Sequence, residues 1–308
     1  MKIYVSEVNE SWVVDRFREE WITYNQDLTV ERIKDSDIVW IISPWVWRKI
    51  SKRNLKSKKV LCTIHHLEEK DFTDKNINEF KKRDAFVDKY HVISKKTKNQ
   101  LEKLTDKEIT YIPFWINQNI WYEIKSKKEL RRKYKLNTER FIVGSFQRDT
   151  EGNDLVSPKL IKGPDRFLKI IKELKKDKEN LTVLLTGKRR NYLINEFKKA
   201  NIDFQYFEMA NFSEMNELYN CLDLYIVSSR IEGGPQAIVE CGLTKTPIIS
   251  TDVGIAKEIL ASESIFNMNN FLLAKPNVEH AFQNSEKLTI PVGFEGFKVM
   301  FKSFYEKI

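Results

Sequence analysis

The sequence predicts an α/β protein built from two doubly wound parallel sheets with a cleft between them. Short apolar runs alternate with charged, amphipathic stretches along the chain, a rhythm typical of parallel strands joined by crossover helices. This rhythm is interrupted once, by a polar and basic stretch at residues 123–137, and then restarts. A chain of 308 residues is long enough for two domains that each bury a core.

The first predicted domain spans residues 1–122. A helix is expected over 13–24, and the predicted strands lie in the runs KIYVSE, DIVWIIS, KVLCTIH, KYHVIS and ITYIP. The linker is placed at 123–137 because EIKSKKELRRKYKLNTE contains no buried strand.

The second predicted domain spans residues 138–290. Helices are expected over 165–175, 193–200 and 213–221, and the strands lie in FIVGSF, LTVLLTG, FQYFEM, LYIVSS and PIIST. Residues 291–308 are aromatic-rich and amphipathic, which predicts a terminal helix that packs back on the first domain. Neither half contains a GxGxxG, so no dinucleotide cofactor is indicated.

Composition limits the environment and the partners. The formal charge of +9 favours an anionic partner, which leaves nucleic acid, a phosphate-bearing substrate and a membrane surface open. The absence of a long apolar run and of a signal pattern predicts a cytoplasmic protein. Three cysteines without CxxC spacing are expected to be reduced core residues.

The segment LYIVSSRIEGGPQAIVECGLTKTPIIST carries the most chemical information. A buried strand ends at Ser229, and Gly233 and Gly234 allow the backbone to approach a ligand closely. Pro235 suits a first helical turn. The free amides of that turn then point at the carboxyl ends of the strands, which predicts a phosphate site.

Two glutamates flank this helix start. Glu232 precedes the helix and Glu240 lies within it, and carboxylates accept hydrogen bonds from sugar and ribose hydroxyls. Taken in isolation, the spacing favours the alternative that Glu232 is a plain loop residue and Glu240 forms a surface ion pair. The glycine-proline context favours the ligand role.

The pattern SR-x-EGGP-x4-E resembles the retaining glycosyltransferases of family 4, which have the two-domain GT-B fold. The resemblance implies that Glu232 contacts the donor sugar and that Glu240 contacts the ribose. The other donor-binding candidates on the motif are Arg230, Gly233, Gly234 and Pro235.

The same resemblance implies a basic pair on the donor diphosphate, here Arg148 and Lys162. Lys159 is a competitor for Lys162, and Gln147 competes for the register of Arg148. Two fixed cations can neutralise a departing diphosphate, so neither a metal nor another cofactor is expected.

Histidines and acidic residues of the first domain offer further candidates. The resemblance implies a catalytic His65 after the strand in CTIHH, with a hydrogen-bonded structural histidine as the alternative, whereas His91 is expected in the core and His280 on the surface. Asp35 and Asp37 spell the DxD of metal-dependent transferases, but acidic residues also commonly precede a strand.

The acceptor side is predicted from aromatic and basic residues of the first domain. Trp45, Trp47 and Trp115 follow strands and could stack on sugar rings. The run RKISKRNLKSKK at 48–59 favours an anionic membrane, an acidic glycan or a lipid diphosphate, with a solvated helix as the alternative.

These features predict a retaining, metal-independent hexosyltransferase that uses a UDP-sugar or GDP-sugar and a glycan or lipid-linked acceptor, at the inner membrane face if the basic run binds lipid. The alternatives are a sugar-nucleotide epimerase of similar fold and a basic nucleic-acid-binding protein. The latter is disfavoured because no RNA-binding or zinc-finger pattern is present.

Overall fold

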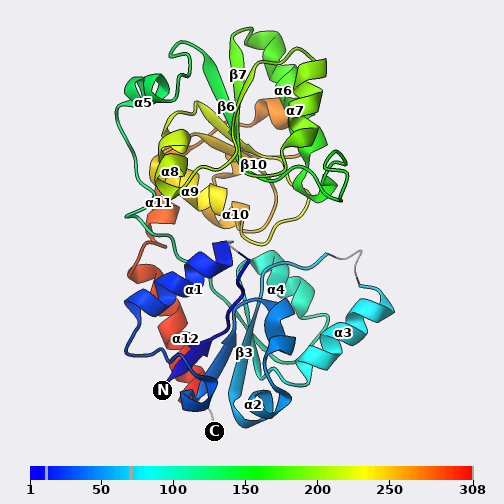
Figure 1. Ribbon diagram of the computed structural model, residues 1–308, viewed down its shortest axis with the longest axis vertical. Helices are drawn as coiled ribbons and strands as arrows, with labels where there is room; N and C mark the ends of the chain where they lie inside the picture. The colour runs from blue at the N-terminus through cyan, green and yellow to red at the C-terminus, as the bar shows by residue number, and fades with distance from the viewer. Residues whose placement is uncertain (11–12, 69–71, 307–308) are drawn as a thin grey trace. The chain divides into compact units, whose positions relative to one another are not determined.

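The computed structural model describes residues 1–10, 13–68 and 72–306. The chain divides into two compact units, which are described separately (Figure 1). The first unit comprises Met1–Trp115 and Ile290–Ile308, and the second comprises Ile116–Thr289. No helix among the described residues is both long and apolar enough to span a bilayer.

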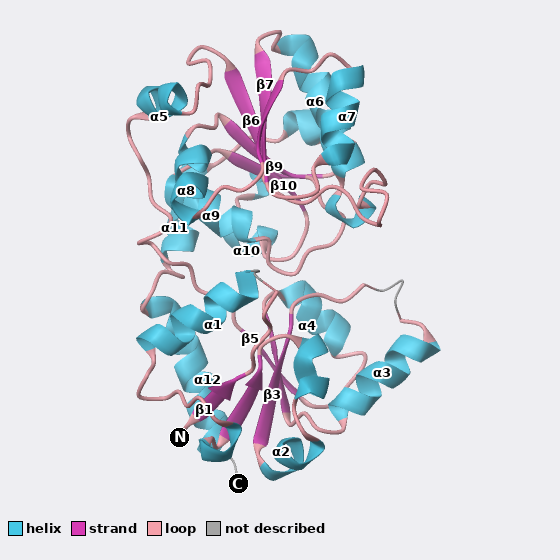
Figure 2. Cartoon of the chain, in the orientation of Figure 1, coloured by secondary structure: helices cyan, strands magenta, loops and turns pink. Residues whose placement is uncertain are grey.

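The first unit contains a parallel sheet of order β1-β2-β3-β4-β5 (Figure 2). Its strands are β1 (Ile3–Val5), β2 (Ile38–Ile41), β3 (Lys59–Ile64), β4 (Lys89–Val92) and β5 (Glu108–Tyr111). Its helices are α1 (Val13–Tyr24), α2 (Lys52–Ser57), α3 (Asp74–Asp84), α4 (Lys95–Leu101) and α12 (Glu295–Glu306), with 3-10 turns η1 (Ile33–Asp35), η2 (Pro44–Lys49) and η7 (Val292–Phe294).

The strands of the first unit lie in the order of the sequence, and an isolated bridge extends the sheet beside β1. After α1 the chain forms a parallel bridge between Thr29 and Ile3 and only then crosses to β2. In the central strands β2, β3 and β4 all residues except the first of β3 are buried. This burial on both faces is expected for a parallel sheet that has helices on each side.

The predicted terminal helix is confirmed, and it completes the core of the first unit (Figure 1). Phe297 and Phe301 of α12 are fully buried, and both rings contact Trp21 and Trp40. Lys59 Nζ donates hydrogen bonds to the last carbonyls of the helix, those of Phe304 and Tyr305, both at 2.9 Å.

The second unit contains a parallel sheet of order β11-β10-β9-β6-β7-β8. Its strands are β6 (Phe141–Ser145), β7 (Leu181–Thr186), β8 (Phe204–Phe207), β9 (Leu224–Val227), β10 (Ile248–Thr251) and β11 (Ile265–Phe266). Its helices are α5 (Lys127–Lys133), α6 (Pro164–Asp177), α7 (Asn191–Lys199), α8 (Phe212–Asn220), α9 (Gln236–Thr244), α10 (Ala256–Ile259) and α11 (Val278–Glu286), with η4 (Leu160–Lys162), η5 (Ser262–Ser264) and η6 (Phe271–Leu273).

Helices cover both faces of this second sheet (Figure 1). Val143 and Val183 pack with α6 and α7, whereas their neighbours Ile142 and Leu184 pack with α8 and α9. Alternate residues of these strands therefore pack into two separate apolar cores, one on each face of the sheet. The two parallel α/β sheets predicted from the sequence are confirmed.

The boundary between the units differs from the predicted linker at 123–137. It lies at Trp115 and Ile116, and the stretch assigned to a linker forms α5 within the second unit. Arg131 of α5 is 4% exposed, and its guanidinium donates to the carbonyl of Cys221 and pairs with Asp223 at 2.6 Å. A helix that buries an arginine looks like a polar linker in the sequence.

Candidate functional site

The candidate site lies where the sheet of the second unit changes direction. The chain leaves β6 towards β7 and β8, and later returns to β9 on the other side of β6. Doubly wound sheets bind ligands at the carboxyl ends of strands at such a switch point. These ends carry Gln147 and Arg148 after β6 and residues 228–232 after β9.

The centre of the site is an ion pair between Lys162 and Glu232. Lys162 Nζ lies 2.6 Å from Glu232 Oε1 and 2.7 Å from Oε2, so the ammonium bridges both carboxylate oxygens. The side chains are 27% and 12% exposed, and the pair is therefore shielded but still reachable by a ligand. Such a pair offers a cation for phosphate and an acceptor for hydroxyls at one point.

Neighbouring polar groups hold this pair in place. Ser229 Oγ lies 3.0 Å from Glu232 Oε1 and 3.2 Å from Gln147 Oε1. Gln147 Nε2 donates to the carbonyl of Lys162 at 2.8 Å. Gln147 therefore contacts the residues that hold the pair, and the choice between Gln147 and Arg148 as the diphosphate contact stays a prediction.

Gly163 allows the helix α6 to begin directly against the end of β9. Its φ is +64°, and a Cβ at this position would lie 2.0 Å from the carbonyl oxygen of Ser228. Ser228 Oγ donates to the carbonyl of Gly163 at 2.8 Å. Position 163 therefore requires glycine because of the backbone conformation and the close approach to Ser228, whereas Lys162 supplies the charge of the site.

Three cations share the electrostatic field of the site. Burial lowers the pKa of Lys159, and the positive charges of Arg148 and Lys162 lower it further, against the carboxylates of Glu151 and Glu232. Arg148 is exposed, and its Nε donates to the carbonyl of Thr150 at 2.7 Å. Sequence reasoning treated Lys159 only as a competitor, but its charge acts together with the other two.

The start of α9 follows the loop that carries Glu232, and Glu240 lies within this helix. Pro235 caps α9, and a Cβ on Gly254 would lie 2.2 Å from the carbonyl oxygen of Gly233, so the two loops touch. Glu240 is 7% exposed, and its Oε2 accepts a hydrogen bond from the Tyr219 hydroxyl at 2.8 Å. Burial and the Glu240 carboxylate raise the pKa of Tyr219 well above its usual value.

Arg230 has a positioning role in this structure. Its two terminal nitrogens donate to the two carboxylate oxygens of Asp165 at 2.7 and 2.6 Å, and one also donates to the carbonyl of Leu160 at 2.7 Å. The hydrogen bond from the Arg230 side chain is the first cause of the lowered pKa of Asp165. This fork ties the loop after β9 to the first turn of α6.

Sequence reasoning missed Arg190, a buried residue that binds groups at the ends of the strands next to the site. Its side chain is fully buried, and the guanidinium donates to Asp149 Oδ2 at 2.9 Å, to the carbonyl of Ser145 at 2.6 Å and to that of Thr186 at 3.0 Å. Arg190 thus joins the carboxyl ends of β6 and β7 to the residue after Arg148. No local motif distinguishes it from Arg189.

His65 lies at the end of β3 in the first unit, as expected. Its Nε2 is 2.9 Å from the carbonyl oxygen of Ile42, so this nitrogen carries a proton and donates it. Burial lowers the pKa of His65 to about 4, which leaves the ring neutral near pH 7. His91 is fully buried and His280 is exposed, so both of these predictions are confirmed.

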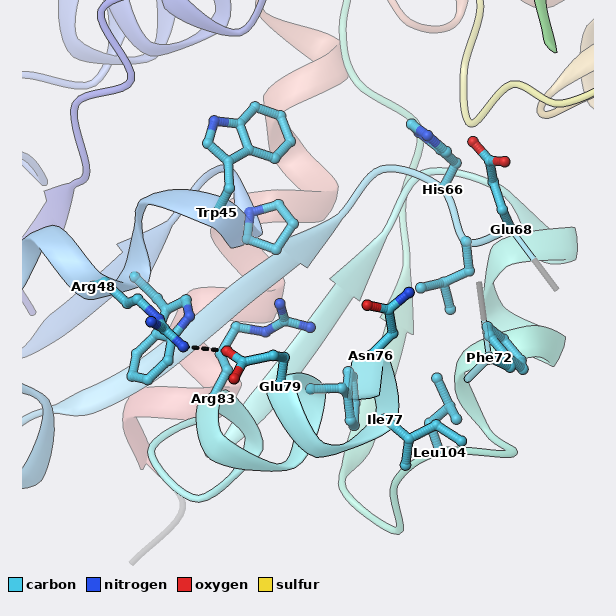
Figure 3. Close-up of a pocket in the computed structure, with 14 residues that line it drawn as sticks. Trp45, Arg48, His66, Glu68, Phe72, Asn76, Ile77, Glu79, Arg83 and Leu104 are labelled. Carbon is cyan, nitrogen blue, oxygen red and sulfur yellow. Dashed lines mark hydrogen bonds and ion pairs between the residues drawn. The ribbon is translucent and has the colours of Figure 1, made fainter. Parts of the chain in front are cut away.

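The three tryptophans predicted for the acceptor separate in the structure. Trp45 and Trp47 line one cavity of the first unit (Figure 3). Trp115 is fully buried, and its indole N–H donates to Glu20 at 2.8 Å, so it is a core residue and the acceptor prediction is corrected. A residue at a strand end can point into the core as easily as away from it.

Several basic residues of the run at 48–59 bind other groups of the first unit. Lys58 Nζ donates to the carbonyl of Lys34 at 3.1 Å, Lys59 caps α12, and Arg48 pairs with Glu79. Lys49 Nζ donates to the carbonyl of Val8 at 3.3 Å. The exposed cations that remain are on α2, namely Lys52, Arg53 and Lys56.

The DxD aspartates bind groups of their own unit. Asp35 pairs with Arg32 at 2.7 Å, and Asp37 accepts a hydrogen bond from the Lys2 amide at 2.7 Å. Over the residues that the structure describes, no group of three or more His, Cys, Asp or Glu side chains is arranged to hold a metal ion.

Comparisons with solved structures show the fold. This chain resembles the Anabaena protein HepE in complex with UDP and glucose, with a TM-score of 0.75 and 12% identity over 98% of this chain and 100% of that chain. Sucrose-phosphate synthase from Thermosynechococcus elongatus gives a TM-score of 0.68 and 15% identity, over 98% and 80%. A glycosyltransferase from Rickettsia africae gives 0.65 and 16%, over 98% and 84%. The predicted GT-B fold is thereby confirmed.

Sequence comparison identifies the family. No curated protein matches this chain. The model of the family "Glycosyl transferases group 1" matches residues 126–289, which include the whole candidate donor site of the second unit. Because this match spans more than half of the chain, the protein belongs to the glycosyl transferases group 1 family.

Proposed function

We propose that this chain is a retaining glycosyltransferase of the family 4 type that transfers a hexosyl unit from a UDP-sugar or GDP-sugar to a glycan or lipid-linked acceptor. The observation that carries the proposal is the Lys162–Glu232 pair at the switch point between β6 and β9. No metal or further cofactor enters the proposed reaction.

The pair suits a ligand that is anionic at one end and rich in hydroxyls at the other. A diphosphate would attract Lys162, with Lys159 and Arg148 adding positive charge beside it. Glu232 would then exchange one cationic partner for the hydroxyls of the donor sugar. The HepE structures bound to UDP and to UDP-glucose support a nucleotide-sugar donor for this fold.

The proposed transfer breaks the bond between the anomeric carbon and the diphosphate oxygen and forms a bond from that carbon to an acceptor oxygen. The acceptor proton passes to the leaving phosphate on the same face of the sugar, which retains the anomeric configuration. The site cations stabilise the charge that develops on the leaving group. His65 is proposed to contact the donor sugar as a neutral hydrogen-bonding group.

The test is a thermal-shift experiment with UDP, GDP and a single-stranded oligonucleotide. Stabilisation by UDP or GDP is expected for the native chain and for Lys172→Met, which removes an exposed lysine from α6, but it should be lost in Lys162→Met. Stabilisation by the oligonucleotide alone would contradict the proposal.

Activity measurements then distinguish a transferase from an epimerase and a metal-independent mechanism from a metal-dependent one. With the nucleotide sugar that binds best, a transferase releases the nucleotide faster when acceptor is added and retains activity in EDTA. Conversion of the sugar nucleotide without any acceptor would indicate an epimerase instead. Loss of activity in EDTA that magnesium or manganese restores would contradict the metal-independent mechanism.

Membrane contact is proposed through α2 only. Lys52, Arg53 and Lys56 are exposed on this short helix, and each could contribute about 1 kcal/mol next to an anionic surface. Sedimentation with anionic and neutral liposomes should show salt-sensitive binding that a variant neutral at these positions lacks. Equal, negligible binding by both proteins would contradict membrane contact.

A further inference from the structure

The first unit contains a cavity of about 430 Å³ with polar and aromatic walls. It is bounded by residues of η2, by His66 and Leu67 after β3, and by one side of α3 (Figure 3). Its lining lies after the carboxyl ends of β2 and β3, where doubly wound sheets bind ligands. Its volume falls within the usual range of small-molecule sites.

Aromatic side chains give the cavity surfaces on which a sugar ring can stack. Trp45 is 44% exposed although its indole N–H donates to Glu10 at 2.9 Å, so its ring is fixed and still accessible. Trp47 and Phe72 contribute further apolar surface. Asn76 adds an amide that can both donate to and accept from hydroxyl groups.

Arg83 is the distinctive charged residue of this cavity. Among the described residues its guanidinium makes no hydrogen bond and no ion pair, although its Nε is buried from solvent. Its guanidinium carbon lies 5.0 Å from the centroid of the Phe80 ring, a cation–π contact. Figure 3 shows Arg83 and Asn76 rising from α3 towards the side of the cavity that carries Trp45.

The other charged groups of the lining are already engaged. Arg48 pairs with Glu79, which also accepts a hydrogen bond from Lys82 at 2.6 Å. His66 and Glu68 also interact with other groups, although the buried Oε2 of Glu68 accepts no hydrogen bond from the described residues. A buried donor without a partner destabilises the protein, and an anionic ligand that accepts its hydrogen bond would remove that penalty.

We propose that this cavity binds a pyranose unit that carries a carboxylate or a phosphate group, with the anion on Arg83 and the ring against the tryptophans. The planar fork of the guanidinium matches both anions, and a neutral sugar would leave it without a partner. Treating this unit as part of the acceptor rests on the proposed function, but the binding itself does not. The acceptor is then an acidic glycan or a phosphorylated one.

The test measures sugar binding in the absence of nucleotide. Glucuronic acid, glucose 6-phosphate and glucose are titrated into the full chain and followed by saturation-transfer NMR. At least one anionic sugar should bind about tenfold or more tightly than glucose, as expected for one charge-assisted pair of hydrogen bonds. The stronger of the two anions identifies carboxylate or phosphate as the recognised group.

Three variants locate the binding. Arg83→Gln should remove the preference for the anionic sugar, whereas Lys81→Gln, which takes one exposed charge from the same helix, should keep it. Arg83→Lys retains the charge without the fork, so a carboxylate should bind more weakly while a phosphate is largely retained. Near-ultraviolet circular dichroism and UDP binding show whether each variant is folded.

Several results would overturn the inference. These are equal affinity for glucose and the anionic sugars, no binding of any of the three sugars, and an anion preference that survives Arg83→Gln. A failure to bind UDP would bear on the proposed function alone, because the donor site belongs to the second unit.

Discussion

Two ion pairs of the second unit show how burial separates a ligand site from a structural contact. Arg190 and Asp149 are 0% and 2% exposed, and Arg190 also binds backbone carbonyls, so no ligand can replace either partner. The Lys162 and Glu232 side chains remain 27% and 12% exposed and face the loops around the switch point. We expect substitutions of the first pair to change stability and those of the second pair to change activity.

Lys162→Met and Glu232→Gln should each lower kcat/KM for transfer by about 100-fold, because each removes a contact with donor groups worth roughly 3 kcal/mol. The two residues contact one another, so the double variant should lose far less than the product of the single effects. Urea unfolding should show little change in stability for either variant. Lys172→Met serves as the matched control, and full turnover by Glu232→Gln would contradict the donor-site assignment.

Buried histidines make the stability of the first unit depend on pH. Burial lowers the pKa of His91 to about 3 and that of His65 to about 4, whereas both are near 6.5 in an unfolded chain. Between these values the unfolded chain binds protons that the folded chain does not. Stability is therefore lost as the pH falls below about 6.5, by about 2 kcal/mol per histidine at pH 5.

This effect is measured by urea unfolding at pH 7 and pH 5, followed by tryptophan fluorescence. Six of the seven tryptophans belong to the first unit, so the signal reports mainly on that unit. In His91→Gln about 2 kcal/mol of the pH dependence should disappear. An unchanged pH dependence in this variant would show that the pKa of His91 is the same in the folded and the unfolded chain.

At the level of elements, the donor site depends on how closely loops approach strand ends. Gly163 and Gly187 both adopt a left-handed conformation, with φ of +64° and +89°. A Cβ on Gly163 would lie 2.0 Å from the carbonyl oxygen of Ser228, whereas the nearest atom to a Cβ on Gly187 is 3.8 Å away. Substituting Gly187 therefore measures backbone strain alone, whereas substituting Gly163 adds a steric clash to that strain.

Gly187→Ala should cost about 1–2 kcal/mol of stability, from backbone strain alone. Gly163→Ala adds a clash with backbone that cannot move aside, so it should cost clearly more and should also weaken UDP binding by displacing Lys162. Chemical unfolding and UDP titration of both variants test this. Equal effects of the two substitutions would show that the approach of Gly163 to β9 is not required.

At the level of the whole molecule, the second unit is one continuous segment, whereas the first is completed by α12. We expect the fragment 116–289 to fold alone and to bind UDP without catalysing transfer. A fragment that starts at residue 138, after the predicted linker, should fold poorly because it lacks Trp121, Leu130 and Arg131, which are buried in the second unit.

Circular dichroism and UDP titration of the two fragments provide the comparison. Stable folding and equal UDP binding by the shorter fragment would support the predicted linker at 123–137 and contradict the boundary at residue 116. Failure of both fragments would show that the second unit requires the first for stability.

Local patterns in the amino-acid sequence are enough to predict the parallel strands, most of the helices and the donor motif. Strands buried on both faces are continuous apolar runs, and the helix start at residue 235 is marked by a local glycine-proline pattern. These signals depend on neighbours in the chain, so they can be read without knowing the fold. Glu232 and Lys162, whose roles the family resemblance implied, do lie together.

Which polar and aromatic side chains already have partners depends on the tertiary structure. Asp165 holds Arg230, Asp149 holds Arg190, and Trp115 is buried in the core, while Arg83 has no hydrogen-bond or ion-pair partner among the described residues. The unit boundary was likewise hidden, because α5 resembles a linker until Arg131 meets Cys221 and Asp223. Partners of this kind lie tens of residues away, and their distances are set by how the strands and helices pack, which no local pattern in the sequence records.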